Sequence, residues 1–170
     1  GLDSPKNKEK ALLYKNNLPS RIGPSKSYFP ALLIENLDFW IDLPKVFVEN
    51  PIGLSGSLMN GSLWSIENRE RFLENEINGA LCIAEINSFE PMLSKYLFSI
   101  VSLEDFQILD AGGFSAKYLR SEKQLLLSSN RVFLDSILIK KINDEREKRR
   151  FPSLAYPSLQ LEYSQRAGLG

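Results

Sequence analysis

Lys45 and Asp110 are two charged residues that each follow a strand-like apolar run, FWIDLP before Lys45 and FQIL before Asp110. Ligands of α/β proteins bind beyond the carboxyl ends of strands, where backbone N–H groups are exposed. An ammonium at Lys45 would neutralise a phosphate or carboxylate, and Asp110 would bind a metal ion or act as a base. The alternatives are a surface lysine and a turn in which Asp110 precedes Gly112 and Gly113.

The loop that follows Lys45 is rich in glycine, serine and asparagine. Its backbone N–H groups and hydroxyls predict an anion-binding nest. The loop matches neither the P-loop nor the dinucleotide fingerprint. The alternative is a flexible connection whose glycines only permit turns. The candidate ligand-binding residues of the loop are Gly53, Ser55, Gly56, Ser57 and Asn60, followed by Gly61.

Three further candidates stand at the predicted start of a helix. Asn130 or Ser129 is a natural N-cap, and Asp135 would interact favourably with the positive end of the helix dipole. Arg131 would hold an anion at the same terminus. A structural role is the preferred interpretation of Asn130 and Asp135. In the alternative, an enzyme, Lys45, Asp110 and Asp135 would form a carboxylate-centred site, with the two aspartates as weak candidates for ligands of a divalent ion.

The composition excludes several classes of site. The chain has 170 residues, no histidine and one cysteine, Cys82. It therefore offers no Ser-His or Cys-His nucleophile, no histidine-ligated zinc, no iron–sulfur cluster and no disulfide of its own. Cys82 lies in the apolar run ALCIAEI, which predicts a small buried side chain. The cofactor, if any, is left unknown.

Charge and hydropathy limit the classes of partner that we expect for the chain. Lys plus Arg and Asp plus Glu number 21 each, so no nucleic acid is expected as a partner. No apolar run approaches about 18 residues, and no membrane span or signal peptide is visible. We expect a soluble, bacterial-type cytoplasmic protein. The alternative, a signal peptide already removed, stays open because Gly1 is compatible with a cleavage scar.

The pattern predicts a polar, proline-punctuated extension over 1–30, with a short helix over 4–17 capped by Ser4, and one α/β domain over 31–170. Within the domain, 31–36 is a short helix or strand end, and Asn78-Gly79 indicates a turn. Pro91 either breaks a helix or opens a second one. We expect a mainly parallel or mixed sheet flanked by helices. The predicted strands are 38–44, 106–113 and 123–129, and the first and last of them are expected to be buried. The predicted helices are 65–77, 130–150 and 158–168, together with one helix of uncertain start within 81–106.

Six short segments follow one another in order along the chain: IDLPK at 41–45, GLSGSLMN at 53–60, IAEIN at 83–87, ILDAGG at 108–113, LLLSSNRVFLD at 125–135 and QRAGLG at 165–170. This ordered set resembles the uncharacterised, often ferredoxin-associated family called domain of unknown function 362. The resemblance covers roughly residues 37–170.

The chain departs from the family's pattern at several motif residues. The Lys-Thr-His that follows Pro-Lys is replaced by Val46 to Asn50, and Met59 replaces a lysine. Asn130-Arg131 replaces Asp-Pro, although Asp135 remains, and the cysteine-rich ferredoxin segment is missing. The resemblance then implies a fragment or shortened member that has lost part of any catalytic site. We therefore expect a binding or accessory module for an anionic small molecule or a redox partner protein.

Overall fold

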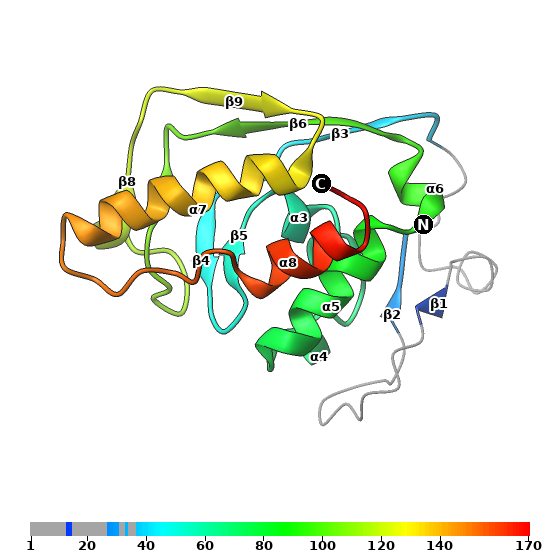
Figure 1. Cartoon of the computed structure of the whole chain (residues 1–170), viewed down its shortest axis with the longest axis horizontal. Coiled ribbons are helices and arrows are strands. Elements are labelled where there is room, and N and C mark those ends of the chain that lie inside the picture. Colours follow the sequence, from blue (N-terminus) through cyan, green and yellow to red (C-terminus); the bar gives the residue numbers. More distant parts are fainter. Residues whose placement is uncertain (1–12, 15–26, 31–32, 34–36) are drawn as a thin grey trace.

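The computed structural model, shown in Figure 1, describes residues 13–14, 27–30, 33 and 37–170 of the chain. It confirms the predicted α/β class with a mixed sheet. The largest sheet has three strands in the order β3 (Trp40–Asp42), β6 (Tyr96–Ser102) and β9 (Leu125–Ser128). β3 and β6 run parallel, whereas β6 and β9 run antiparallel.

Three antiparallel pairs complete the described strands. β4 (Phe47–Glu49) and β5 (Gly53–Ser55) form a hairpin, and β7 (Phe106–Gln107) pairs with β8 (Leu119–Arg120). β1 (Leu13–Tyr14) pairs with β2 (Ser27–Tyr28). Leu13 and Tyr14 are the described part of the predicted helix 4–17, which is wrong there because they lie in a strand. Its proposed cap, Ser4, and all but Leu33 of 31–36 lie outside the described residues.

Helices cover one face of the three-stranded sheet, as Figure 1 shows for α7 (Arg131–Glu147). α8 (Leu159–Arg166) packs against α7 and against α5 (Glu76–Asn87). The remaining described helical segments are short: α3 (Ser57–Asn60), η1 (Leu63–Ser65), α4 (Glu70–Leu73), α6 (Glu90–Leu93) and η2 (Ala116–Tyr118). No helix among the described residues is long and apolar enough to cross a membrane.

The three-stranded sheet is covered by helices on one face only, which corrects the two buried strands predicted over 38–44 and 123–129. On its inner face Asp42 and Val101 are buried. On its outer face Ile41, Leu125 and Leu127 are 43%, 73% and 65% exposed. Successive strand residues point to opposite faces, so helices on one side bury only every second residue. The apolar runs gave no sign of this because both faces carry apolar side chains.

The region from 65 to 102 departs most from prediction. The predicted helix 65–77 is divided among η1, α4 and the start of α5. Within 81–106 the predicted helix is confirmed as far as Asn87 in α5, and again in α6, whereas β6 occupies 96–102. Asn78-Gly79 is not a turn but lies in α5, where Asn75 accepts a hydrogen bond from the Asn78 N–H at 3.2 Å. A Cβ at Gly79 would lie 2.2 Å from Ile52 Cδ1. Packing therefore explains this glycine.

Other local predictions are confirmed. Pro91 lies in the first turn of α6, so it opens a second helix. Cys82 is fully buried, and burial raises the pKa of its thiol. Helix α8 follows Ser158, and Gly168 just after it has a φ of +82°. By contrast, the strand predicted over 106–113 is confirmed only at its start, since β7 comprises Phe106 and Gln107 alone.

Asn130 caps α7 as predicted: its Oδ1 accepts a hydrogen bond from the Phe133 N–H at 2.8 Å. Asn130→Ala should lower the free energy of unfolding by about 1 kcal/mol, because it leaves that amide without its partner. Ser158→Ala is the matched control, since the buried Ser158 Oγ has no hydrogen-bond partner. Urea denaturation measures both, and an equal loss in the two variants would contradict the capping role.

Candidate functional site

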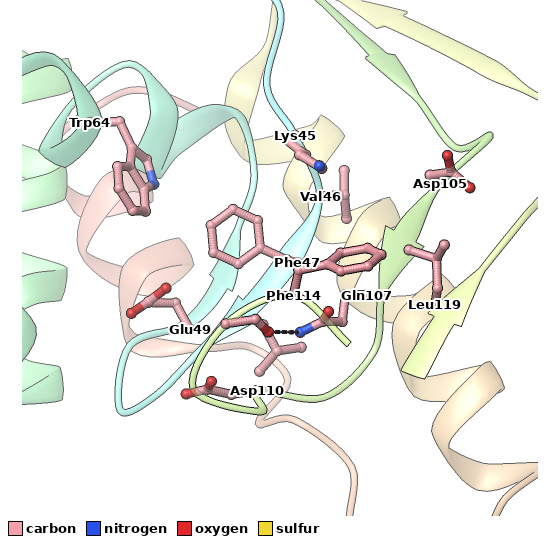
Figure 2. A pocket seen from close by; sticks show the side chains of 12 residues that line it. Lys45, Val46, Phe47, Glu49, Trp64, Asp105, Gln107, Asp110, Phe114 and Leu119 are labelled. Atoms are coloured by element: carbon pink, nitrogen blue, oxygen red, sulfur yellow. Dashed lines mark hydrogen bonds between the residues drawn. The ribbon is translucent and has the colours of Figure 1, made fainter. Parts of the chain in front are cut away.

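Lys45 and Asp110 line one pocket, which has a volume of about 330 Å³. It lies where the β4–β5 hairpin meets β7, β8 and the loop between them (Figure 2). Aromatic and aliphatic side chains form most of the wall, and a few charged groups stand among them. Besides Lys45 and Asp110, the lining residues are Val46, Phe47, Val48, Glu49, Trp64, Asp105, Gln107, Gly113, Phe114 and Leu119.

Gln107 holds the part of the pocket that follows β7. Its backbone N–H donates to the Val46 carbonyl at 3.1 Å, which joins β7 to the start of β4. Its side-chain Nε2 donates to the carbonyls of Leu109 and Gly113, and its Oε1 accepts from the Ser115 N–H. This buried amide thereby fixes the loop that carries Asp110 and Phe114. The sequence signal was a polar residue inside the apolar run FQIL.

Asp110 also stabilises its own turn. Its Oδ1 accepts from the Gly112 N–H at 2.8 Å, and its Oδ2 accepts from the Asn50 N–H at 3.0 Å. Gly112 and Gly113 have φ values of +70° and +145°, which favour glycine. The carboxylate therefore has the turn role considered as an alternative, while it also lines the pocket.

The charge on the pocket wall is predominantly negative. Glu49, Asp105 and Asp110 carry carboxylates, and Lys45 carries the ammonium. Burial raises the pKa of Glu49, and the charge of Asp110 raises it further, whereas Arg69 lowers it. Arg69 places its guanidinium carbon 4.0 Å from the centroid of the Trp64 ring.

The predicted anion-binding loop lies elsewhere and already binds an anion of this chain. The backbone N–H groups of Ser57 and Leu58, at the start of α3, donate to Asp135 Oδ1 and Oδ2 at 2.7 and 3.0 Å. Gly56 permits this approach, because a Cβ there would lie 2.5 Å from Asp135 Oδ1. The amides are arranged as an anion-binding nest requires, but they are occupied by an internal carboxylate.

A second buried carboxylate, Asp42, ties α3 to the sheet. Its Oδ2 accepts from the hydroxyls of Ser57 and Ser99, both at 3.0 Å. Its Oδ1 accepts from the Asn60 Nδ2 at 2.5 Å. Tyr96 extends the network, with its hydroxyl 2.9 Å from Ser99 Oγ. Asp42 and Ser99 were not predicted; their only sequence signal is a polar residue within each apolar strand.

Arg131 supplies the positive charge of this buried network. Its guanidinium carbon lies 4.4 Å from the Trp40 ring centroid and 3.8 Å from that of Tyr96, and one of its nitrogens donates to Asn87. Arg131 is only 6% exposed, and burial lowers its pKa. A Cβ at Gly61 would lie 2.6 Å from this guanidinium. Arg131 therefore faces the interior, whereas an external anion would need it at the surface.

Most of the candidate residues fall into two separate groups. Lys45, Asp110 and Gly113 line the pocket, with Gly112 beside it. Ser57, Asn60, Arg131 and Asp135 belong to the buried network, and Gly56 adjoins it. Three others have structural contacts: Asn130 caps α7, Gly53 pairs with Glu49 in the hairpin, and Ser55 Oγ accepts from Trp64 Nε1. Within the described part of the chain, no three carboxylate or thiol groups gather as a metal site would require.

Comparisons with known proteins leave the family open. No family model matches the chain, and neither a curated protein nor a solved structure matches it. The resemblance to domain of unknown function 362 therefore stays a prediction.

The buried network predicts an unusual dependence of stability on pH. Burial raises the pKa of Asp135 to about 7, and the charge of Asp42 adds to the effect, while the two amides and Arg131 oppose it. In the unfolded chain an aspartate titrates near about 4. Because the folded state holds this proton more tightly, stability should fall as pH rises from about 4 to about 7.

Asp135→Asn should remove most of this slope, since it replaces the titrating carboxylate by a neutral amide. The chain has no histidine, so few other groups titrate near neutrality. Urea denaturation at a series of pH values measures the slope. Asp144→Asn, at an exposed position of α7, is the matched control and should keep it. A wild-type protein whose stability is constant or rises between pH 4 and 7 would contradict the raised pKa of Asp135.

Gly56→Ala should cost about 2 kcal/mol of unfolding free energy, because the added methyl group displaces the carboxylate of Asp135 from the two amides. The same substitution in an Asp135→Ser background should cost much less, since the shorter side chain leaves room. A double-mutant cycle from denaturation curves measures this coupling. Equal costs in both backgrounds would show that the glycine is needed for another reason.

Proposed function

We propose that this domain binds a small organic molecule in the pocket between the β4–β5 hairpin and the loop after β7, and acts as a binding module. The observation that carries the proposal is the pocket itself, with a volume of about 330 Å³ and a largely apolar, partly aromatic wall. Small-molecule sites are typically concave and apolar, with a few polar groups that orient the ligand. Lys45, Glu49 and Asp110 would be those groups here.

The enzyme alternative has less support. It requires Lys45, Asp110 and Asp135 in one site, but Asp135 is fully buried and does not line the pocket. A general base must come within hydrogen-bond reach of its substrate, and Asp135 is engaged with the amides of Ser57 and Leu58. Only two of the three residues remain available to a ligand.

The anionic ligand expected from the sequence rested on Lys45 and on the loop amides together. The amides of Ser57 and Leu58 already bind Asp135, so Lys45 would have to hold an anion without them. Glu49 and Asp110 in the same wall would repel that anion. The redox partner stays a prediction for which the described surface offers no specific observation.

A thermal-shift screen of small organic molecules tests the proposal, because ligands that bind the native state raise the melting temperature. Phe114→Ala should lower the affinity for pocket ligands about tenfold, since an aromatic wall is lost. The thermal shifts that these ligands produce should shrink or disappear. Phe114 is 73% exposed, so its removal should change the stability of the free protein little.

Phe133→Ala is the matched control, because Phe133 is 60% exposed but lies on α7 and does not line the pocket. It should leave the ligand-induced shifts unchanged. A screen without hits, or hits that survive Phe114→Ala with unchanged affinity, would contradict binding at this site.

A further inference from the structure

We infer that the ligand of this pocket is an organic cation, namely a small apolar amine in its ammonium form; the inference rests on the proposed function. The pocket wall carries three carboxylates, those of Glu49, Asp105 and Asp110, and one ammonium, that of Lys45, while the Arg69 guanidinium beside Trp64 offsets part of the negative charge at Glu49. A ligand that carries a positive charge would compensate this excess, whereas a neutral ligand would leave it unchanged.

Glu49 is the group that would meet the ammonium. It is half-buried, and among the described residues its carboxylate takes part in no hydrogen bond or ion pair. Desolvation and the neighbouring Asp110 both disfavour its charged form, so its pKa is raised. An ammonium beside it would favour the charged form again, and this gain is available only to a cation.

Aromatic rings beside Glu49 add a second attraction for positive charge. The Phe47 and Trp64 rings lie 5.9 Å apart at an angle of 57°, which forms a corner of two aromatic faces. The chain's own cation, Arg69, already stacks on Trp64 with its guanidinium carbon 4.0 Å from the ring centroid. Carboxylates next to aromatic faces are the usual surroundings of bound ammonium groups.

The arrangement of charges gives the ligand an orientation. In Figure 2, Glu49 and Asp110 lie to one side of the phenylalanine rings, and Lys45 and Asp105 lie to the other. The ammonium would therefore occupy the end with the two carboxylates, and the apolar body would pack on the rings of Phe47 and Phe114. Lys45 would repel the opposite orientation.

Three isosteric probes test the charge of the ligand: benzylammonium, benzyl alcohol and benzoate, titrated into the protein by calorimetry or NMR. We expect benzylammonium to bind about tenfold more tightly than benzyl alcohol, with benzoate weakest. Glu49→Gln should weaken benzylammonium about tenfold and change benzyl alcohol less than about twofold. The matched control is Glu104→Gln, because Glu104 is exposed and does not line this pocket.

The wild-type protein supplies a measurement that needs no variant. As pH falls through the raised pKa of Glu49, benzylammonium should bind more weakly, while benzyl alcohol should bind equally well. Tighter binding of benzyl alcohol or benzoate would overturn the cationic ligand and leave the pocket's binding function standing. No binding of any probe, together with a screen without hits, would remove the proposed function as well.

Discussion

The bidentate contact between the Asp135 carboxylate and the amides of Ser57 and Leu58 is the interaction on which this fold depends most. It attaches α7 to the start of α3, across 78 residues of sequence. The Ser57 hydroxyl then donates a hydrogen bond to Asp42 in β3, which links α3 to the sheet. A buried amide that loses its acceptor destabilises the fold by more than the hydrogen bond itself contributes. Loss of this contact would therefore destabilise the packing of α3, α7 and the sheet.

The interior that results contains the carboxyl groups of Asp42 and Asp135 and the guanidinium of Arg131, so its charges balance only where Asp135, whose pKa is raised, holds a proton. Arg131 lies between Trp40 and Tyr96, so its positive charge is stabilised by ring faces as well as by the aspartates. The candidate pocket lies apart from this network and is built from short strands and a loop held by Gln107. The buried network therefore joins α3, α7 and the sheet, while the pocket of the proposed ligand lies in another part of the domain.

Sequence predicted the elements whose signals are local and missed those that depend on distant contacts. Helix α7 has a cap and a long apolar face within its own segment, so it was recognised. Gly79 leaves room for the side chain of Ile52, which lies 27 positions earlier in the sequence. Because that contact is distant in sequence, a glycine within a helix was mistaken for a turn. The candidate site was likewise predicted only as far as local signals reach. Lys45 and Asp110 were expected at strand ends and share one pocket, but no pattern could show that the loop amides would be occupied by Asp135.

Gly56 and Gly61 have negative φ values, so their backbone conformation does not require glycine. A side chain at either position would instead collide with a charged group of another helix. Each glycine therefore forms a pair with a residue of α7: Gly56 with Asp135, and Gly61 with Arg131. In homologous chains, a larger residue at either position requires a shorter partner in α7, so these pairs should vary together. Such covariation would identify distant relatives more reliably than the apolar strands, whose residues can be exchanged for others of similar size.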